Sequence, residues 1–165
     1  MTDLQALAYA MRIEQESAKY YNHYSSRCKS DNSKIIFEAL AKMEADHYEI
    51  LKKQYDSVAK DGNWLEIKLD GFTSPNLLLN KGTERITESE LDSELSDVTI
   101  LRMAYLMEND LAIFYKEWSK KTEDPFAEKL LIKLSEWENE HYNMLYAEHT
   151  MLLKNSWFKM GFAPF

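Results

Sequence analysis

The feature that most constrains this chain is an internal repeat of residues that can bind metal ions. The repeat has a constant offset of 94 positions (108 − 14). The first half contains Glu14, Tyr21, Glu44 and His47, and the second half contains the equivalent residues Glu108, Tyr115, Glu138 and His141. On a helix, residues three apart share one face, and residues seven apart lie about two turns apart on that face. Because the ligand-type side chains repeat best, the sequence predicts a binding site as well as a fold.

Each half of the repeat is predicted to form a helical hairpin. If the two glutamates of one half lie at equal height on antiparallel helices, the turns must fall midway, near residues 29 and 123. The polar stretch 28–33 contains good N-cap residues, and Asp124 precedes Pro125, which suits the first position of a helix. The turn signals therefore fall where the geometry requires them.

Glycine and proline are concentrated between the two halves. Three of the four glycines and Pro75 lie within residues 61–96, whereas 3–60 and 97–155 contain only Pro125. We therefore expect an all-α fold with four long helices at about 3–28, 31–60, 97–121 and 125–154. Together they would make one domain over residues 1–165.

The segment 61–96 is long enough to return along the bundle, which predicts an up-down-down-up order. Within it, the alternation of Leu65, Ile67 and Leu69 with charged residues suggests a short extended piece, and residues 87–90 could begin a short helix. Thr2 and Gln5 form a plausible capping box for the first long helix.

Composition excludes several classes of function. The chain has 165 residues, 45% of them apolar, which is enough for one core. A net charge of −8 with no Lys/Arg cluster argues against nucleic-acid or anionic-membrane partners. A single cysteine and the lack of a long apolar run or basic leader favour a cytoplasmic protein without a membrane span.

The repeated residues supply four carboxylates and two imidazoles, which would converge if the two hairpins meet at this level. Such an oxygen-rich set with one nitrogen per metal suits iron or manganese. Four carboxylates also balance the charge of two divalent cations. Without metal, burial and mutual repulsion should raise the pKa values of all four glutamates.

The two Glu-x6-Tyr…Glu-x2-His blocks resemble the rubrerythrin branch of the ferritin-like di-iron family over residues 4–55 and 98–150. The resemblance implies a ferritin-like four-helix bundle with two iron ions per chain, with manganese or a mixed pair as options. It also implies terminal ligands Glu14 and Glu108, bridging ligands Glu44 and Glu138, one histidine (His47 or His141) per metal, and Tyr21 and Tyr115 as donors to carboxylates across the site.

The chain departs from the full-length family at two points. One cysteine, Cys28, rules out a cysteine-ligated rubredoxin iron, and Leu111 stands where relatives carry an extra glutamate. We therefore expect slower peroxide turnover than in a relative with that glutamate. His23 and His149 have no counterpart in the other half and are predicted to be surface or hydrogen-bonded residues.

Three functions follow from these observations. The first is an oxidoreductase that reduces O2 or hydrogen peroxide with electrons from an external donor. The second is a ferroxidase or iron-storage protein, and the third is a bundle with a purely structural metal. Six protein ligands for two ions, three per iron, leave coordination positions open, which favours the first two functions. The long crossover and the apolar tail 157–165 favour a homodimer over a storage shell.

Overall fold

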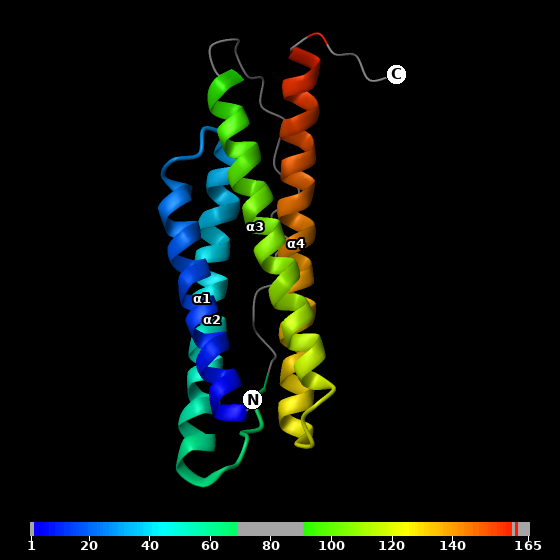
Figure 1. Cartoon of the computed structure of the whole chain (residues 1–165). Coiled ribbons are helices and arrows are strands. Elements are labelled where there is room, and N and C mark those ends of the chain that lie inside the picture. Colours follow the sequence, from blue (N-terminus) through cyan, green and yellow to red (C-terminus); the bar gives the residue numbers. More distant parts are fainter. Residues whose placement is uncertain (1, 69–90, 160, 162–165) are drawn as a thin grey trace.

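Four helices make up almost all of the structure. A computed structural model describes residues 2–68, 91–159 and 161, with backbone only at 91–95 and 159. The helices are α1 (Asp3–Ser25), α2 (Asp31–Asp61), α3 (Leu91–Ser119) and α4 (Pro125–Lys159), and no strand occurs in this part of the chain. The all-α four-helix bundle is confirmed, and α1 and α4 run opposite to α2 and α3 (Figure 1).

Helix starts follow the predicted capping chemistry. Thr2 and Gln5 form the expected capping box at the start of α1. Asp124 accepts hydrogen bonds from the backbone of Phe126 (2.8 Å) and Ala127 (3.1 Å), so it caps α4 just before Pro125. Both hairpin turns therefore lie at the predicted places.

Several predicted helix boundaries are wrong. The first helix ends at Ser25 rather than 28, because the backbone N–H groups of Arg27 and Cys28 turn back to the Tyr24 carbonyl. The third helix begins at Leu91 rather than 97, since neither glycine nor proline interrupts residues 91–96. The fourth continues to Lys159 rather than 154, and a left-handed glycine at 161 (φ 78°) follows it.

The predicted extended piece is only partly within the described residues, and there it is not a strand. Gln54 instead bonds both backbone groups of Leu65, donating to its carbonyl (2.9 Å) and accepting from its N–H (2.8 Å). The predicted short helix at 87–90 lies outside the described residues. Among the helices that are described, none has an apolar stretch sufficient to cross a membrane.

Packing is closest within the two hairpins, α1 with α2 and α3 with α4, and α2 also contacts α4. Two apolar clusters fill the bundle. One contains Leu7, Leu51 and Leu131, and the other contains Phe37 and Leu101. On every helix a buried polar position separates the two clusters. The fold therefore encloses a polar layer between two apolar ones.

Candidate metal centre

The polar layer contains all six predicted ligands. The structure groups them into two sets of four whose ligand atoms lie within 4.8 Å of one another: Glu14, Glu44, His47 and Glu138, and Glu44, Glu108, Glu138 and His141. Glu44 and Glu138 belong to both sets. Every one of the six side chains is buried, the most exposed being His47 at 4%.

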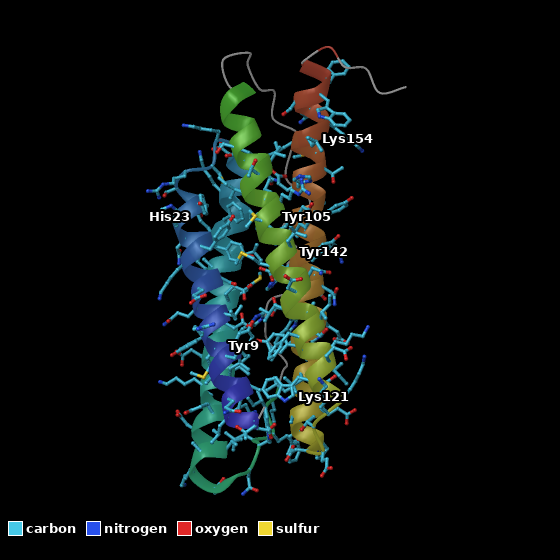
Figure 2. The ribbon with its side chains drawn as sticks, in the orientation of Figure 1. Tyr9, His23, Tyr105, Lys121, Tyr142 and Lys154 are labelled. Atoms are coloured by element: carbon cyan, nitrogen blue, oxygen red, sulfur yellow. The ribbon has the colours of Figure 1, made fainter. Side chains whose placement is uncertain are left out.

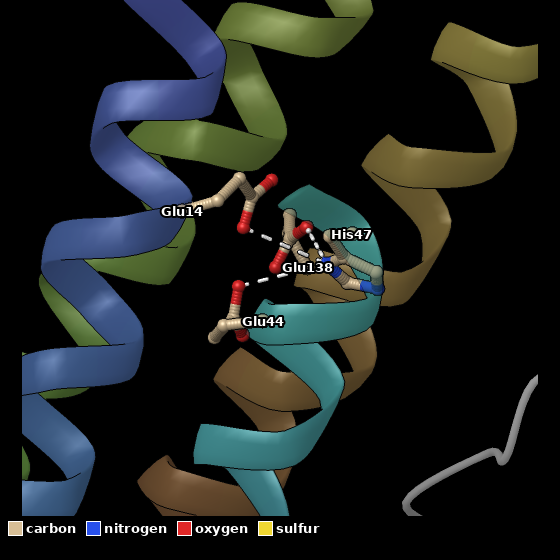
Figure 3. Close-up of side chains that lie close together, drawn as sticks. All are labelled: Glu14, Glu44, His47 and Glu138. Carbon is tan, nitrogen blue, oxygen red and sulfur yellow. Dashed lines mark ion pairs between the residues drawn. The ribbon is translucent and has the colours of Figure 1, made fainter. Parts of the chain in front are cut away.

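The first set surrounds Nδ1 of His47 (Figure 3). This nitrogen lies 3.0 Å from Glu138 Oε1, 3.5 Å from Glu44 Oε2 and 3.6 Å from Glu14 Oε2. One oxygen from each of three glutamates therefore faces one imidazole nitrogen.

The second set repeats this arrangement around Nδ1 of His141. It lies 2.9 Å from Glu44 Oε1, 3.0 Å from Glu138 Oε2 and 3.4 Å from Glu108 Oε2. Glu44 and Glu138 thus each turn one oxygen to each histidine, the arrangement that a carboxylate bridging two metal ions requires. The positions of Glu44 and Glu138 suit their predicted role as bridging ligands. Those of Glu14 and Glu108 suit the predicted role of terminal ligands.

The two tyrosines bind the terminal glutamates crosswise between the hairpins. The Tyr21 hydroxyl donates to Glu108 Oε1, and the Tyr115 hydroxyl donates to Glu14 Oε1. Each bond occupies one oxygen and leaves Oε2 facing the histidine. The tyrosines therefore favour binding of a metal through a single oxygen of each terminal glutamate.

Ligand atoms in the centre lack the hydrogen bonds that buried polar atoms normally make. Within the described residues, no hydrogen-bond partner is present for Oε2 of Glu14 and Glu108, both oxygens of Glu44, Oε1 of Glu138 or Nδ1 of His47. Their close approaches, such as 3.0 Å between His47 Nδ1 and Glu138 Oε1, lack hydrogen-bonding direction. Because such orphaned atoms are costly, a pair of cations that accepts their lone pairs fits this donor set.

The pKa values of the glutamates divide into two classes. Burial, followed by repulsion from Glu44 and Glu138, raises the pKa of Glu14 well above its usual value. Burial and the charge of Glu44 do the same for Glu108. For Glu44, burial alone would raise the pKa, but the interaction with Glu14 and the positive charge of His141 outweigh it and lower the pKa.

Glu138 also has a lowered pKa, since the charges of both histidines outweigh burial and the repulsion of Glu44. The expectation that all four glutamate pKa values rise is therefore wrong for the central pair. Burial alone would lower the pKa values of His47 and His141, but the charges of Glu138 and Glu44, respectively, help to raise them well above usual. These shifts favour protons on the outer glutamates and on the imidazoles in the metal-free centre, and that arrangement of charges would have no net charge.

Aromatic rings fix the orientation of the imidazoles. The ring of His47 stacks on Trp137, with centroids 5.2 Å apart and planes 10° apart, and it also stacks on His141 at 5.4 Å. The sequence did not predict this role of Trp137. The residue is adjacent to the ligand Glu138 in the chain, and the equivalent position in the first half of the repeat is Met43, which is not aromatic.

The sequence analysis also missed a second buried polar group at the α1–α2 turn. Asp97 accepts hydrogen bonds from the backbone of Lys29 (2.7 Å) and Ser30 (2.9 Å). Glu148 accepts from the hydroxyls of Ser30 (3.0 Å) and Ser33 (2.8 Å). The same repeat could have revealed this group, because the positions 94 residues earlier are the polar Asp3 and Gln54.

Of the two unrepeated histidines, His23 is exposed, as expected. His149 differs from expectation, since it is buried beside the rings of Tyr105 and Tyr146. Its Nδ1 has no hydrogen-bond partner among the described residues, and burial lowers its pKa. Tyr105 lies on α3 and is labelled in Figure 2.

Comparison with known proteins agrees with this geometry. The family model described as Rubrerythrin matches residues 5–149, a span that includes the six clustered residues and both tyrosines. Neither the search of curated proteins nor the search of solved structures gave a match. The family match covers most of the chain, and the buried carboxylate and histidine cluster can hold metal. This chain belongs to the rubrerythrin family, with its ferritin-like four-helix fold.

Proposed function

We propose that the protein is an oxidoreductase that reduces O2 or hydrogen peroxide at a pair of metal ions, with iron as the first candidate and manganese or a mixed pair as alternatives. The observation that supports it most directly is the convergence of six buried ligand residues on two points, with Oε or Nδ1 atoms on five of them lacking a hydrogen-bond partner among the described residues. Such a donor set suits redox-active divalent ions.

The six residues would hold the two ions in equivalent environments. Glu14 and His47 would serve one ion and Glu108 and His141 the other, while Glu44 and Glu138 would bind both. When bound, the metal pair supplies one electron per ion and Lewis acidity. The protein holds the ligands in place through the tyrosine hydrogen bonds and the Trp137 ring, and the two apolar clusters keep bulk water away.

The proposed reaction requires an external electron donor, because the single cysteine provides no iron–sulfur or rubredoxin site. We also propose a cytoplasmic homodimer. Trp157 and Phe158, which are 51% and 77% exposed at the end of α4, support an apolar contact with a second chain.

The test is anaerobic Fe(II) loading followed by rapid mixing with O2 or hydrogen peroxide in separate experiments, with and without an added reductant. An oxidoreductase should oxidise its iron and return to the ferrous state with each turnover when reductant is present. Accumulation of ferric iron beyond two ions per chain would indicate storage instead. Bound iron that reacts with neither oxidant would indicate a structural metal and would overturn the proposal.

A further inference from the structure

A groove of about 310 Å³ opens between α1 and α3, which belong to different hairpins (Figure 1). Its lining residues come from both helices: Tyr9, Ile13, Glu16, Ser17, Met107, Asp110, Leu111 and Phe114. A second hollow of about 490 Å³ shares Asp110 and Phe114 and extends to Lys121. Figure 2 labels Tyr9 and Lys121, which line the first and the second hollow.

The floor of this groove is formed by two residues related by the repeat. Ser17 and Leu111 are 94 positions apart (111 − 17), and they are 2% and 4% exposed. Each follows a terminal glutamate by three residues, so each lies one helical turn from it on the same face. The same side chains therefore line the groove and adjoin the metal centre.

The chemistry of the floor suits a small uncharged molecule. A hydroxymethyl group and an isobutyl group form the floor, and the two carboxylates, Glu16 and Asp110, are exposed. An ion would lose hydration in passing Leu111, whereas an apolar diatomic molecule would lose almost nothing. Leucine has no branch at Cβ, so a change of the Leu111 rotamer is the movement that would open the floor.

We propose that the α1–α3 groove is the path by which dioxygen reaches the metal centre, and that Leu111 and Ser17 form its inner gate. This inference rests on the proposed function and specifies it further: the favoured oxidant is the small apolar one. The proposal also predicts that a change in the size of the side chain at position 17 or 111 alters the access of dioxygen to the metal centre without removing a metal ligand.

Two variants change the gate in opposite directions. Leu111→Ala enlarges the passage, whereas Ser17→Leu fills it from the other helix. Leu152→Ala is the control, since it removes an equally buried leucine near the far end of α4. Metal content measured for every variant would show whether the centre remains intact.

The first readout is the rate at which nitric oxide, a small diatomic probe, binds to the anaerobic ferrous protein in stopped flow. Ser17→Leu should slow binding by about tenfold, Leu111→Ala should accelerate it, and Leu152→Ala should leave it unchanged. Equal rates in wild type and both gate variants, with metal content retained, would overturn the path while leaving the proposed function intact.

The second readout needs no metal chemistry. Crystals of the protein under xenon pressure should show xenon at the floor of the groove in wild type and not in Ser17→Leu, because dry apolar spaces bind this gas. A groove floor without xenon in wild type would overturn the path. Protein that bound no iron would refute the proposed function, and the xenon result would then still decide whether the groove admits apolar gases.

Discussion

Loading of the metal centre should release protons, and the number follows from the structure. A glutamate or histidine must be deprotonated to bind a metal ion. In the metal-free centre four groups have raised pKa values, namely Glu14, His47, Glu108 and His141. Two divalent ions would therefore replace up to four protons, leaving the buried centre neutral before and after binding.

The number of protons released at pH 6.5 distinguishes a centre with raised pKa values from a site with unperturbed pKa values. With unperturbed pKa values, near 6.5 for each histidine and 4.5 for each glutamate, two half-protonated imidazoles would release about one proton in total. With both histidine pKa values raised, we expect about two protons from the imidazoles and further protons from Glu14 and Glu108. The count should fall as the pH rises through the raised pKa values.

The assay is anaerobic addition of Fe(II) or Mn(II) to weakly buffered protein that contains a pH indicator. His47→Ala should release fewer protons than wild type. Asp46→Asn, which changes an exposed residue outside the centre, should release the same number. Release of one proton or fewer per chain at pH 6.5, with two ions bound, would refute the assigned protonation.

Three further predictions concern stability, ligand roles and oxidant preference. Groups with raised pKa values stabilise the metal-free fold at low pH and lose that contribution as the pH rises. The gain in Tm on adding Mn(II) should therefore be larger at pH 8 than at pH 6. A Tm that does not depend on metal would contradict a coupled buried site. Glu44→Ala and Glu138→Ala should reduce the occupancy of both metal positions, whereas His47→Ala and His141→Ala should retain about one ion per chain, as measured by elemental analysis. Identical losses of metal in all four variants would contradict the division into bridging and terminal ligands. Leu111→Glu should raise the rate of peroxide reduction more than that of O2 reduction, since it adds a carboxylate beside the centre, and rapid peroxide consumption by wild type that this change left unaltered would argue against the reasoning.

The sequence predicted the fold and the position of the cluster because both depend on spacing. A constant offset of 94 places equivalent residues at equivalent heights, and the turns near Ser30 and Asp124 fix those heights. Helix ends were less predictable. Ser25 and the residues after it turn back locally, and the start at Leu91 has no glycine or proline to mark it.

Protonation and the groove depend on distances that spacing does not give. Glu14 and Glu44 are both buried glutamates, yet their pKa values move in opposite directions. Burial and repulsion by Glu138 and Glu44 raise the pKa of Glu14. For Glu44, the interaction with Glu14 and the charge of His141, which lies 2.9 Å away, outweigh burial and lower the pKa. Likewise, Ser17 and Leu111 can be paired from the repeat, but only the separation of α1 from α3 reveals that a groove reaches them.

The central claim is that six buried residues hold two metal ions, and crystals loaded anaerobically with Fe(II) test it directly by anomalous diffraction at the iron edge. We predict two peaks per chain, one beside Nδ1 of His47 and one beside Nδ1 of His141, with Glu44 and Glu138 between them. A single peak, or two peaks elsewhere on the protein, would contradict the account.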